Sequence, residues 1–203
     1  MRGVLITFEG VEGSGKTTQM LRLARWLKRQ GHTVERTREP DGTRLGQGVR
    51  RLFERGPDPL TEMFLFLAAR RQHVVEHIQP WLRARRVVLS DRYTDATIAY
   101  QGYGRGLDPE MIRELNLRAT GGVLPDLTLL FDLDPAIGFC RIGSRRLDHF
   151  ERQALAFHRR VRRGYLEIQR AEPKRVRIVD AARPAAVVAA DVQAIVAEAL
   201  RGA

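Results

Sequence analysis

Residues 5–31 read LITFEGVEGSGKTTQMLRLARWLKRQG, and three patterns follow one another within them. The apolar, β-prone run of residues 5–8 predicts a short buried strand. From residue 20 to residue 27 apolar side chains recur at helical spacing, and Gly31 stands where such a helix should end. Between them, residues 10–17 fit the pattern G-x-x-x-x-G-K-[ST] without a mismatch. We therefore expect a phosphate-binding loop between a buried strand and a helix N-terminus.

The residue types of this loop suit a polyphosphate ligand. Glycines allow the backbone to fold into a nest whose N–H groups point at an anion, and the helix N-terminus adds unpaired N–H groups and a positive dipole end. Lys16 supplies a mobile charge for the outer phosphates, and the hydroxyl of Thr17 can bind Mg²⁺. A glycine-rich turn that matches by chance is the alternative. The flanking strand and helix favour a site for a nucleoside triphosphate.

The rest of the chain alternates between strand-like and helical patterns. Further strands are expected at residues 33–37, 87–90, 127–133 and 176–179. Helices are expected at 45–53, 61–85, 109–119, 135–141, 150–171 and 186–200, with Thr61 and Asp108 as N-caps and Pro80 as a kink or break. No repeat or linker interrupts this order, which predicts one α/β domain over residues 1–203, a doubly wound parallel sheet of about five strands flanked by helices. Residues 141–149, rich in basic and small side chains, are a candidate lid.

The bulk composition limits the possible partners and locations. The net charge of +11 could mark a nucleic-acid-binding face, or it could serve small polyphosphate substrates on an otherwise solvated surface. The arginines are spread through the predicted helices, which favours the second interpretation, so no nucleic acid is expected as a partner. No run approaches the ~20 apolar residues of a membrane helix. The single Cys140 fits a reducing compartment, so we expect a cytoplasmic protein without a signal peptide.

Two large classes of phosphate-loop proteins do not fit this chain. A GTPase should carry D-x-x-G and [NT]-K-x-D, and neither pattern occurs in the sequence. A motor-type ATPase should end its second core strand in Asp-Glu, whereas residues 87–90 are followed by Asp91-Arg92. The acid can hold Mg²⁺ through water, and the guanidinium of Arg92 suits a second phosphorylated substrate.

Four motifs then occur in order along nearly the whole chain: FEGVEGSGKTTQ at 8–19, TREPDGT at 37–43, DRYTDATIAYQGYGRG at 91–106 and PDLTLLFDLDP at 125–135. In this combination the sequence resembles the bacterial thymidylate kinases. The resemblance implies a cytosolic homodimer that transfers the γ-phosphoryl group of Mg·ATP to dTMP and releases dTDP. Its substrates would be ATP and dTMP, and its metal Mg²⁺.

The resemblance also implies a role for each residue that matches a family motif. ATP would be bound by Gly10, Val11, Glu12, Gly13, Ser14, Gly15, Lys16, Thr17 and Thr18, and the metal by Thr17, Asp91 and Glu9. The implied dTMP site consists of Glu9, Arg38, Pro40, Phe66, Arg70, Arg92, Thr97, Tyr100 and Gln101. The implied catalytic residues are Lys16, Arg92, Arg141, Arg145 and Arg146.

Within the implied dTMP site, Phe66 would stack on thymine and Arg70 would bond the O4 atom of the base. Arg38 and Arg92 would grip the phosphate, and Tyr100 would crowd the 2′ position. Glu9 would face the 3′-hydroxyl or the metal. The variable positions 11–14 of the phosphate loop contain no arginine, so the charge of the transition state must be met from elsewhere. The resemblance implies that Arg141, Arg145 and Arg146 of the lid meet it.

The sequence departs from the family pattern at four places. Asp41 replaces a usual glycine, Ala96 a usual serine and His149 a usual arginine, and the lid is short with Gly143-Ser144 in it. Three alternatives stay open. The acceptor could be dUMP, because one methyl group gives a pocket only ~1–3 kcal/mol of discrimination. The chain could be a nucleotide-binding module without turnover, or its charge could serve nucleic acid, which predicts a salt-dependent affinity for DNA.

Overall fold

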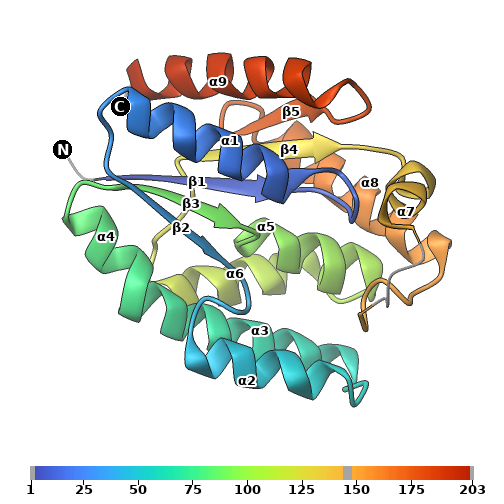
Figure 1. Ribbon diagram of the computed structural model, residues 1–203. Coiled ribbons are helices and arrows are strands. Elements are labelled where there is room, and N and C mark those ends of the chain that lie inside the picture. Colours follow the sequence, from blue (N-terminus) through green and yellow to red (C-terminus); the bar gives the residue numbers. More distant parts are fainter. Residues whose placement is uncertain (1–2, 144–147, 202–203) are drawn as a thin grey trace.

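A five-stranded parallel sheet forms the centre of this computed structural model, which describes residues 3–143 and 148–201. The described strands are β1 (Val4–Glu9), β2 (Val34–Arg38), β3 (Val87–Asp91), β4 (Leu127–Asp132) and β5 (Val176–Asp180). They lie in the order β2-β3-β1-β4-β5, with every neighbouring pair parallel (Figure 1). Each strand lies within a residue or two of its predicted position. The expected α/β fold is confirmed.

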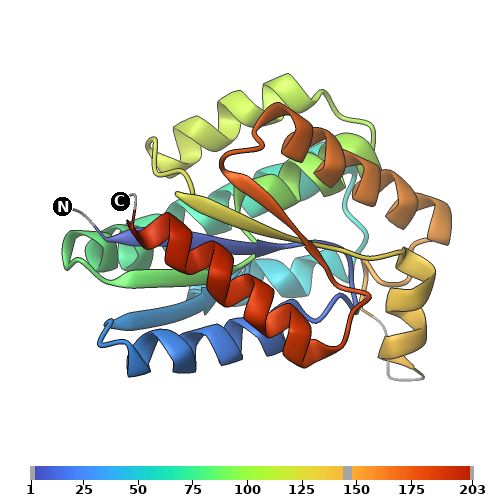
Figure 2. The ribbon, with the colours of Figure 1, turned by 90° about the horizontal axis from the view of Figure 1, so that it is seen from above.

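Helices cover both faces of the sheet. The helical elements that the described ranges contain are α1 (Lys16–Arg29), α2 (Arg44–Phe53), α3 (Pro59–His73), the π-helix η1 (Val74–Ile78), α4 (Gln79–Arg83), α5 (Thr94–Thr97), the π-helix η2 (Ile98–Gly104), α6 (Pro109–Thr120), α7 (Pro135–Ile142), α8 (Leu155–Ala171) and α9 (Ala185–Arg201). Helices α1 and α9 lie side by side on one face, as the view from above shows (Figure 2). Helices α3, α4, α6 and α8 lie on the other side of the sheet, and α2 packs outside α3.

Alternation along β1 explains how the central strand serves both faces. Ile6 and Phe8 point into the apolar core under α1 and α9, together with Leu23 and Leu27 of α1. Leu5 points to the opposite core, and Thr7 on that face bonds the hydroxyl of Thr128 across the strands at 2.8 Å. Because side chains alternate along a strand, Glu9 belongs to the face of Leu5 and Thr7, and it ends β1 below the sheet.

Two predicted helix starts were wrong for local reasons. Helix α3 begins at Pro59, because the carboxylate of Asp58 accepts the N–H groups of Leu60 and Thr61 at 3.0 and 3.2 Å, so Asp58 and not Thr61 is the N-cap. Helix α8 begins at Leu155 and not near residue 150. The predicted N-cap at Asp108 is confirmed by its bond to the N–H of Glu110 at 2.9 Å.

The late start of α8 has a clear cause in the turn before it. The Asp148 carboxylate accepts the N–H groups of Phe150 and Glu151, both at 2.9 Å, and the Glu151 carboxylate accepts the N–H of Asp148 at 2.9 Å. This reciprocal capping closes a turn over residues 148–151 that is separate from the helix.

The long helix from residue 59 to residue 83 continues through Pro80 and widens just before it. The N–H of Gln79 bonds the carbonyl of Val74, five residues back, so residues 74–78 form a π-turn. Proline lacks an N–H group and crowds the preceding turn, and the wider π-turn accommodates it without breaking the element.

Candidate active site

The phosphate-binding loop has backbone angles that favour glycine at three positions. Gly10, Gly13 and Gly15 have positive φ angles of 134°, 71° and 86°. A Cβ atom on Gly13 would lie 2.1 Å from the carbonyl oxygen of Gly138 in α7. Conversely, a Cβ on Gly138 would lie 2.2 Å from the carbonyl oxygen of Glu12. The loop and α7 therefore meet backbone to backbone.

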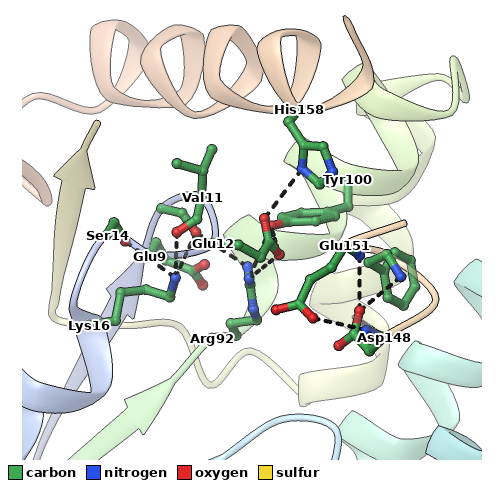
Figure 3. Close-up of polar contacts among 12 residues, drawn as sticks. Glu9, Val11, Glu12, Ser14, Lys16, Arg92, Tyr100, Asp148, Glu151 and His158 are labelled. Carbon is green, nitrogen blue, oxygen red and sulfur yellow. Dashed lines mark hydrogen bonds and ion pairs between the residues drawn. The ribbon is translucent and has the colours of Figure 1, made fainter. Parts of the chain in front are cut away.

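Lys16 lies inside the loop and points back at it. Its Nζ donates to the carbonyl oxygens of Gly10 and Val11, both at 2.9 Å (Figure 3). Burial lowers the pKa of Lys16 to about 8, and the positive charge of Arg92 acts in the same direction. The ammonium group is thus held among carbonyls and close to neutralisation. An anion placed in the loop would favour its protonated form.

Thr17 and Asp91 form the pair best suited to a metal. The Thr17 hydroxyl donates to Oδ2 of Asp91 at 2.7 Å, which joins the start of α1 to the end of β3. In the described residues no group of three or more His, Cys, Asp or Glu side chains could hold a metal ion by itself. A hydroxyl and one carboxylate fit Mg²⁺, which usually takes one or two protein ligands and completes its shell with phosphates and water.

Glu12, Arg92 and Tyr100 form a buried polar centre between the phosphate loop and η2. Oε1 of Glu12 accepts from Nη2 of Arg92 at 2.8 Å and from the Tyr100 hydroxyl at 2.5 Å (Figure 3). Burial works to raise the pKa of Glu12, but the positive charges of Arg92 and Lys16 outweigh it and hold that pKa well below its usual range. The Arg92 guanidinium also lies 4.7 Å from the centroid of the Tyr100 ring.

Arg92 reaches this centre from an unusual backbone position. Its φ angle is 72°, in the left-handed region that non-glycine residues rarely adopt. The hydroxyl of Ser90 donates to the Arg92 carbonyl at 2.7 Å, and the Arg92 N–H bonds the carbonyl of Phe8 at 3.0 Å. These two bonds hold the turn that aims the guanidinium at the phosphate loop.

Glu9 is fully buried, and both of its oxygens are occupied. Oε1 accepts the N–H of Tyr93 and Oε2 accepts the hydroxyl of Tyr165, each at 2.7 Å. Burial raises the pKa of Glu9 to about 8, and the negative charge of Asp95 adds to the effect. Glu9 is not among the residues that line the cavity described next.

One cavity of about 280 Å³ joins the phosphate loop to the second half of the site. It brings together the predicted residues Glu12, Gly13, Lys16, Thr17, Asp91, Arg38, Pro40, Phe66, Arg70, Arg92, Thr97, Tyr100 and Gln101. The loop residues Gly10, Val11, Ser14, Gly15 and Thr18 do not line it, and neither does Arg141. The predicted Arg145 and Arg146 lie outside the described residues.

Arg70 lines the cavity although it is almost fully buried, 1% exposed. Nε donates to Oε2 of Glu39 at 2.8 Å, and Nη2 lies 2.7 Å from the same oxygen in an ion pair and donates to the carbonyl of Tyr93 at 2.8 Å. Nη1 donates to Thr97 at 2.9 Å and to Asn116 at 2.6 Å. Four of the five N–H groups of the guanidinium therefore donate hydrogen bonds within the protein, which leaves little free capacity for a ligand atom.

Aromatic side chains form the wall beside Arg70. Phe66 stacks on Phe53 of α2 with ring centroids 4.5 Å apart, and Phe150 lies 5.7 Å from Phe66. All three rings line the cavity. Sequence reasoning found Phe66 alone, because Phe53 and Phe150 reach it from separate parts of the chain. The pattern of α2 would have given Phe53 only as an apolar position.

A second ionic cluster braces η2 against α3. Glu62, fully buried, accepts from Gln101 at 2.8 Å and from Arg105 at 2.9 Å. His149 lies with Nε2 3.4 Å from Oε2 of Glu62. The predicted ligand Gln101 is thus oriented by Glu62, a contact between residues 39 positions apart for which the sequence gives no signal.

Arg141 faces away from the cavity. It stands in the last turn of α7 and donates to the carbonyls of Ala181 and Ala182 at 2.8 and 3.3 Å. These bonds tie α7 to the loop after β5.

No helix in the described ranges is long and apolar enough to cross a membrane.

A phosphate loop at the end of a parallel strand, opening on a cavity that arginines from β2, α3 and the end of β3 also line, defines a P-loop kinase. Comparison with known proteins identifies which one: the family model described as thymidylate kinase matches residues 8–192. The chain belongs to the thymidylate kinase family, and the resemblance seen in the sequence is confirmed.

Curated relatives and a solved structure agree with this assignment. The thymidylate kinase of Solidesulfovibrio magneticus is 50% identical, with 97% of this chain and all of the relative covered. That of Nitratidesulfovibrio vulgaris strain DP4 is 49% identical, with 97% of this chain and 93% of the relative covered. The crystal structure of thymidylate kinase from Ehrlichia chaffeensis superposes with a TM-score of 0.79 at 36% identity, covering 97% of this chain and 99% of that one.

Proposed function

We propose that this protein transfers the γ-phosphoryl group of ATP to dTMP and forms dTDP. The observation that carries the proposal is the shared cavity. Lys16 and Thr17 line it on the side of the phosphate loop, and Arg38, Phe66 and Arg70 line it on the other side. A phosphoryl group can pass directly from donor to acceptor only if both substrates are bound in one continuous space.

On the ATP side, the loop from Gly10 to Thr18 would hold the phosphates through its backbone N–H groups and Lys16. Mg²⁺ would be held by Thr17 and Asp91, whose 2.7 Å contact brings a hydroxyl and a carboxylate together. When bound, Mg²⁺ would supply positive charge that offsets the negative charge of the phosphates. Glu9, with both oxygens bonded to tyrosines, would act behind this pair and not as a direct ligand.

On the acceptor side, Phe66 would stack on the thymine base at the aromatic wall. Arg70 and Thr97, already bonded to each other at 2.9 Å, would meet the polar edge of the base, with Gln101 and Pro40 completing the pocket. Arg38 and Arg92 would take the phosphate, and Tyr100 would stand beside the sugar. The Arg92 guanidinium would then exchange part of its bond to Glu12 for the phosphate of dTMP.

The chemistry proposed for these residues is positioning and charge neutralisation without a covalent intermediate. Lys16 and Arg92 both line the cavity and both donate to the carbonyl of Gly10, and they would stabilise the charge that develops on the transferred group. We propose a single domain over residues 1–203 and keep Arg145, Arg146 and the lid at 141–149 as further catalytic elements. Arg141, which donates to the carbonyls of Ala181 and Ala182, would have to release these bonds to join them. An arginine in this role contributes ~10³–10⁵ in rate in related enzymes.

The test is an assay of ADP release with Mg·ATP and dTMP, dUMP, dCMP, UMP or AMP in turn. We expect release at least several-fold faster with dTMP than with any other acceptor. Faster release with dUMP would move the assignment to that acceptor. ADP release with none of them, although ATP binds, would leave a nucleotide-binding module, and a Lys16→Ala variant that kept its biological function would support that outcome.

We further propose a homodimer and a cytoplasmic location, as the family resemblance implies. Phe64 of α3, Val75 of η1 and Leu117 of α6 are large apolar side chains with 50%, 46% and 49% of their surface exposed. Exposed apolar groups on adjacent helices support an interface on this side of the molecule. Light scattering of the purified chain measures the mass in solution, and a Phe64→Glu variant should shift it towards the monomer.

A further inference from the structure

The carboxylate of Asp41 lies between two arginines at the edge of the cavity. Its Oδ2 is 3.2 Å from Nη2 of Arg38, the last residue of β2, and 3.4 Å from Nη1 of Arg50 in α2. All three residues line the cavity, and Arg38 is the arginine assigned above to the phosphate of the acceptor. The Asp41 carboxylate is therefore paired with the guanidinium of Arg38, the same group that would bind the phosphate of the acceptor.

Asp41 is not bonded as a structural carboxylate would be. Its Oδ1 is buried and has no hydrogen-bond partner in the described part of the chain. The whole side chain is only 11% exposed. Asp148, which contacts the other end of Arg50 at 3.3 Å, uses its own Oδ1 to accept two backbone N–H groups. Buried carboxylate oxygens in folded proteins nearly always have donors, so the unbonded oxygen of Asp41 requires an explanation other than stability.

We propose that Asp41 is an internal competitor of the acceptor's phosphate. Its carboxylate pairs with Arg38 and Arg50 while the acceptor site is free, and it gives up Arg38 when a phosphorylated acceptor binds. Asp41 thereby lowers the affinity for dTMP. This inference rests on the proposed function, because it takes Arg38 as a ligand of the acceptor's phosphate.

The sign of the effect follows from two opposing contributions. Asp41 orients two arginines, but their side chains are 66% and 48% exposed, and exposed ion pairs contribute little. Against this, the carboxylate of Asp41 would repel the phosphate ester of the acceptor, which carries a charge close to −2. Repulsion and competition for Arg38 therefore outweigh the benefit of orientation, and removal of the charge should strengthen binding.

The experiment compares wild type and Asp41→Asn by calorimetric titration with dTMP and with thymidine at one fixed salt concentration. Thymidine has the same base and sugar but no phosphate. We expect Asp41→Asn to lower the Kd for dTMP roughly three- to tenfold, with the Kd for thymidine unchanged. Asp41→Ser is the second variant, which removes the charge with a smaller side chain and should change the dTMP affinity in the same direction.

The matched control is Glu167→Gln. Glu167 of α8 does not line the cavity, and its carboxylate forms an exposed ion pair with Arg170 at 2.6 Å. This variant changes the net charge of the chain by the same amount as Asp41→Asn. It should leave the Kd for dTMP within about twofold of wild type, because the exposed pair contributes little.

Each other outcome overturns a stated part of the inference. Weaker or unchanged dTMP binding in both Asp41 variants would show that Asp41 orients Arg38 and Arg50 and does not compete with the acceptor. Equal changes for dTMP and thymidine would show an effect of shape and not of phosphate charge. If wild type neither binds nor phosphorylates dTMP, the proposed function fails and the inference with it. Normal dTMP turnover in wild type with no effect of the Asp41 variants overturns the inference alone.

Discussion

Nδ1 of His158 in α8 lies 3.3 Å from Oε2 of Glu12 in the phosphate loop. The ring of His158 is fully buried, and neither of these two atoms makes a hydrogen bond within residues 3–143 and 148–201. The other oxygen of Glu12 accepts from Arg92 and Tyr100. His158 therefore stands behind the carboxylate that orients two residues of the proposed acceptor site (Figure 3).

Replacement of His158 should act on the acceptor through Glu12. In His158→Leu, Oε2 of Glu12 loses the ring nitrogen that lies 3.3 Å from it, and an unsatisfied buried polar group costs about 1–3 kcal/mol. We expect kcat/KM for dTMP to fall roughly tenfold with little change in the KM for ATP. In His158→Asn the amide nitrogen can take the place of Nδ1, so this variant should recover most of the loss. Equal losses in both variants would reduce His158 to a packing residue.

The affinity for ATP should depend on pH through Lys16. Its pKa of about 8 in the free protein is low because of burial and the nearby Arg92, whereas bound phosphates favour the charged form. Above pH 8 the binding of ATP must therefore take up a proton, and the Kd should rise up to about tenfold per pH unit. Titration calorimetry in buffers of different ionisation enthalpy measures this uptake. A Lys16→Met variant should bind weakly and without that dependence, and proton uptake retained in it would assign the effect to another group.

Glu9 should make the folded state less stable as the pH rises. Its pKa is about 8 in the folded chain and near 4.5 when unfolded, so between these values only the folded state retains the proton. Unfolding then releases a proton, and stability falls with rising pH by at most about 1.4 kcal/mol per unit. Below this window both states are protonated and the contribution vanishes. In Glu9→Gln the amide oxygen can accept the N–H of Tyr93, and the amide NH2 can donate to the hydroxyl oxygen of Tyr165. This variant should be more stable than wild type at pH 8 and similar to it near pH 4.5.

Urea unfolding at pH 5, 6.5 and 8 checks the prediction for Glu9. The control is Glu76→Gln, because Glu76 of η1 has 42% of its side chain exposed and should show no such difference. A Glu9→Gln variant that loses the same stability at every pH would indicate that the two tyrosines need the carboxylate itself.

Gly138 should be as important to the phosphate loop as the glycines within the motif. A Cβ at Gly138 would lie 2.2 Å from the carbonyl oxygen of Glu12, so Gly138→Ala must displace α7 or the loop. We expect the Kd for ATP to rise at least about tenfold and the unfolding free energy to fall by roughly 1–3 kcal/mol, as for other overpacked sites. Equilibrium titration with ATP and thermal unfolding measure the two effects.

Gly48 in α2 provides the matched helical glycine. Its added Cβ would meet nothing nearer than Arg51 at 3.9 Å. Gly48→Ala should therefore raise stability by about 0.5–1 kcal/mol, the usual gain for this exchange inside a helix. If Gly138→Ala behaved in the same way, the close approach of α7 to the loop would have no energetic importance.

The regular part of this fold is readable in the sequence, since apolar periodicity marks each strand and the loop motif lies between a strand and a helix. Residues 94–106 are different. Their glycines suggest an irregular segment, yet residues 98–104 form the helical element η2. A Cβ at Gly104 would lie 2.7 Å from Phe157 of α8, so the packing of η2 on α8 requires a glycine at this position. Local propensity does not reveal such a requirement.

The contacts that orient the site residues were equally hidden. Glu39 and Asn116 converge on Arg70 from 31 and 46 residues away, and His158 meets Glu12 across most of the chain. Each is an ordinary residue type in an ordinary local pattern. The motifs therefore predicted many of the side chains that line the cavity, such as Lys16, Arg38 and Arg70, although Glu9 and Arg141 do not line it. The supporting partners depend on tertiary packing that one sequence does not encode in any local signal.

The buried ion pair between Arg70 and Glu39 limits how this member of the family could be redirected to another acceptor. The guanidinium of Arg70 is buried, and a substitution that removes it would leave the buried carboxylate of Glu39 without its main partner. Uncompensated buried charges cost several kcal/mol, so substitutions here would be eliminated by misfolding before any new preference appeared. Substitutions that change the preferred acceptor are thus expected at neighbouring residues such as Phe66 and Ala96, because a change there leaves no buried charge without its partner.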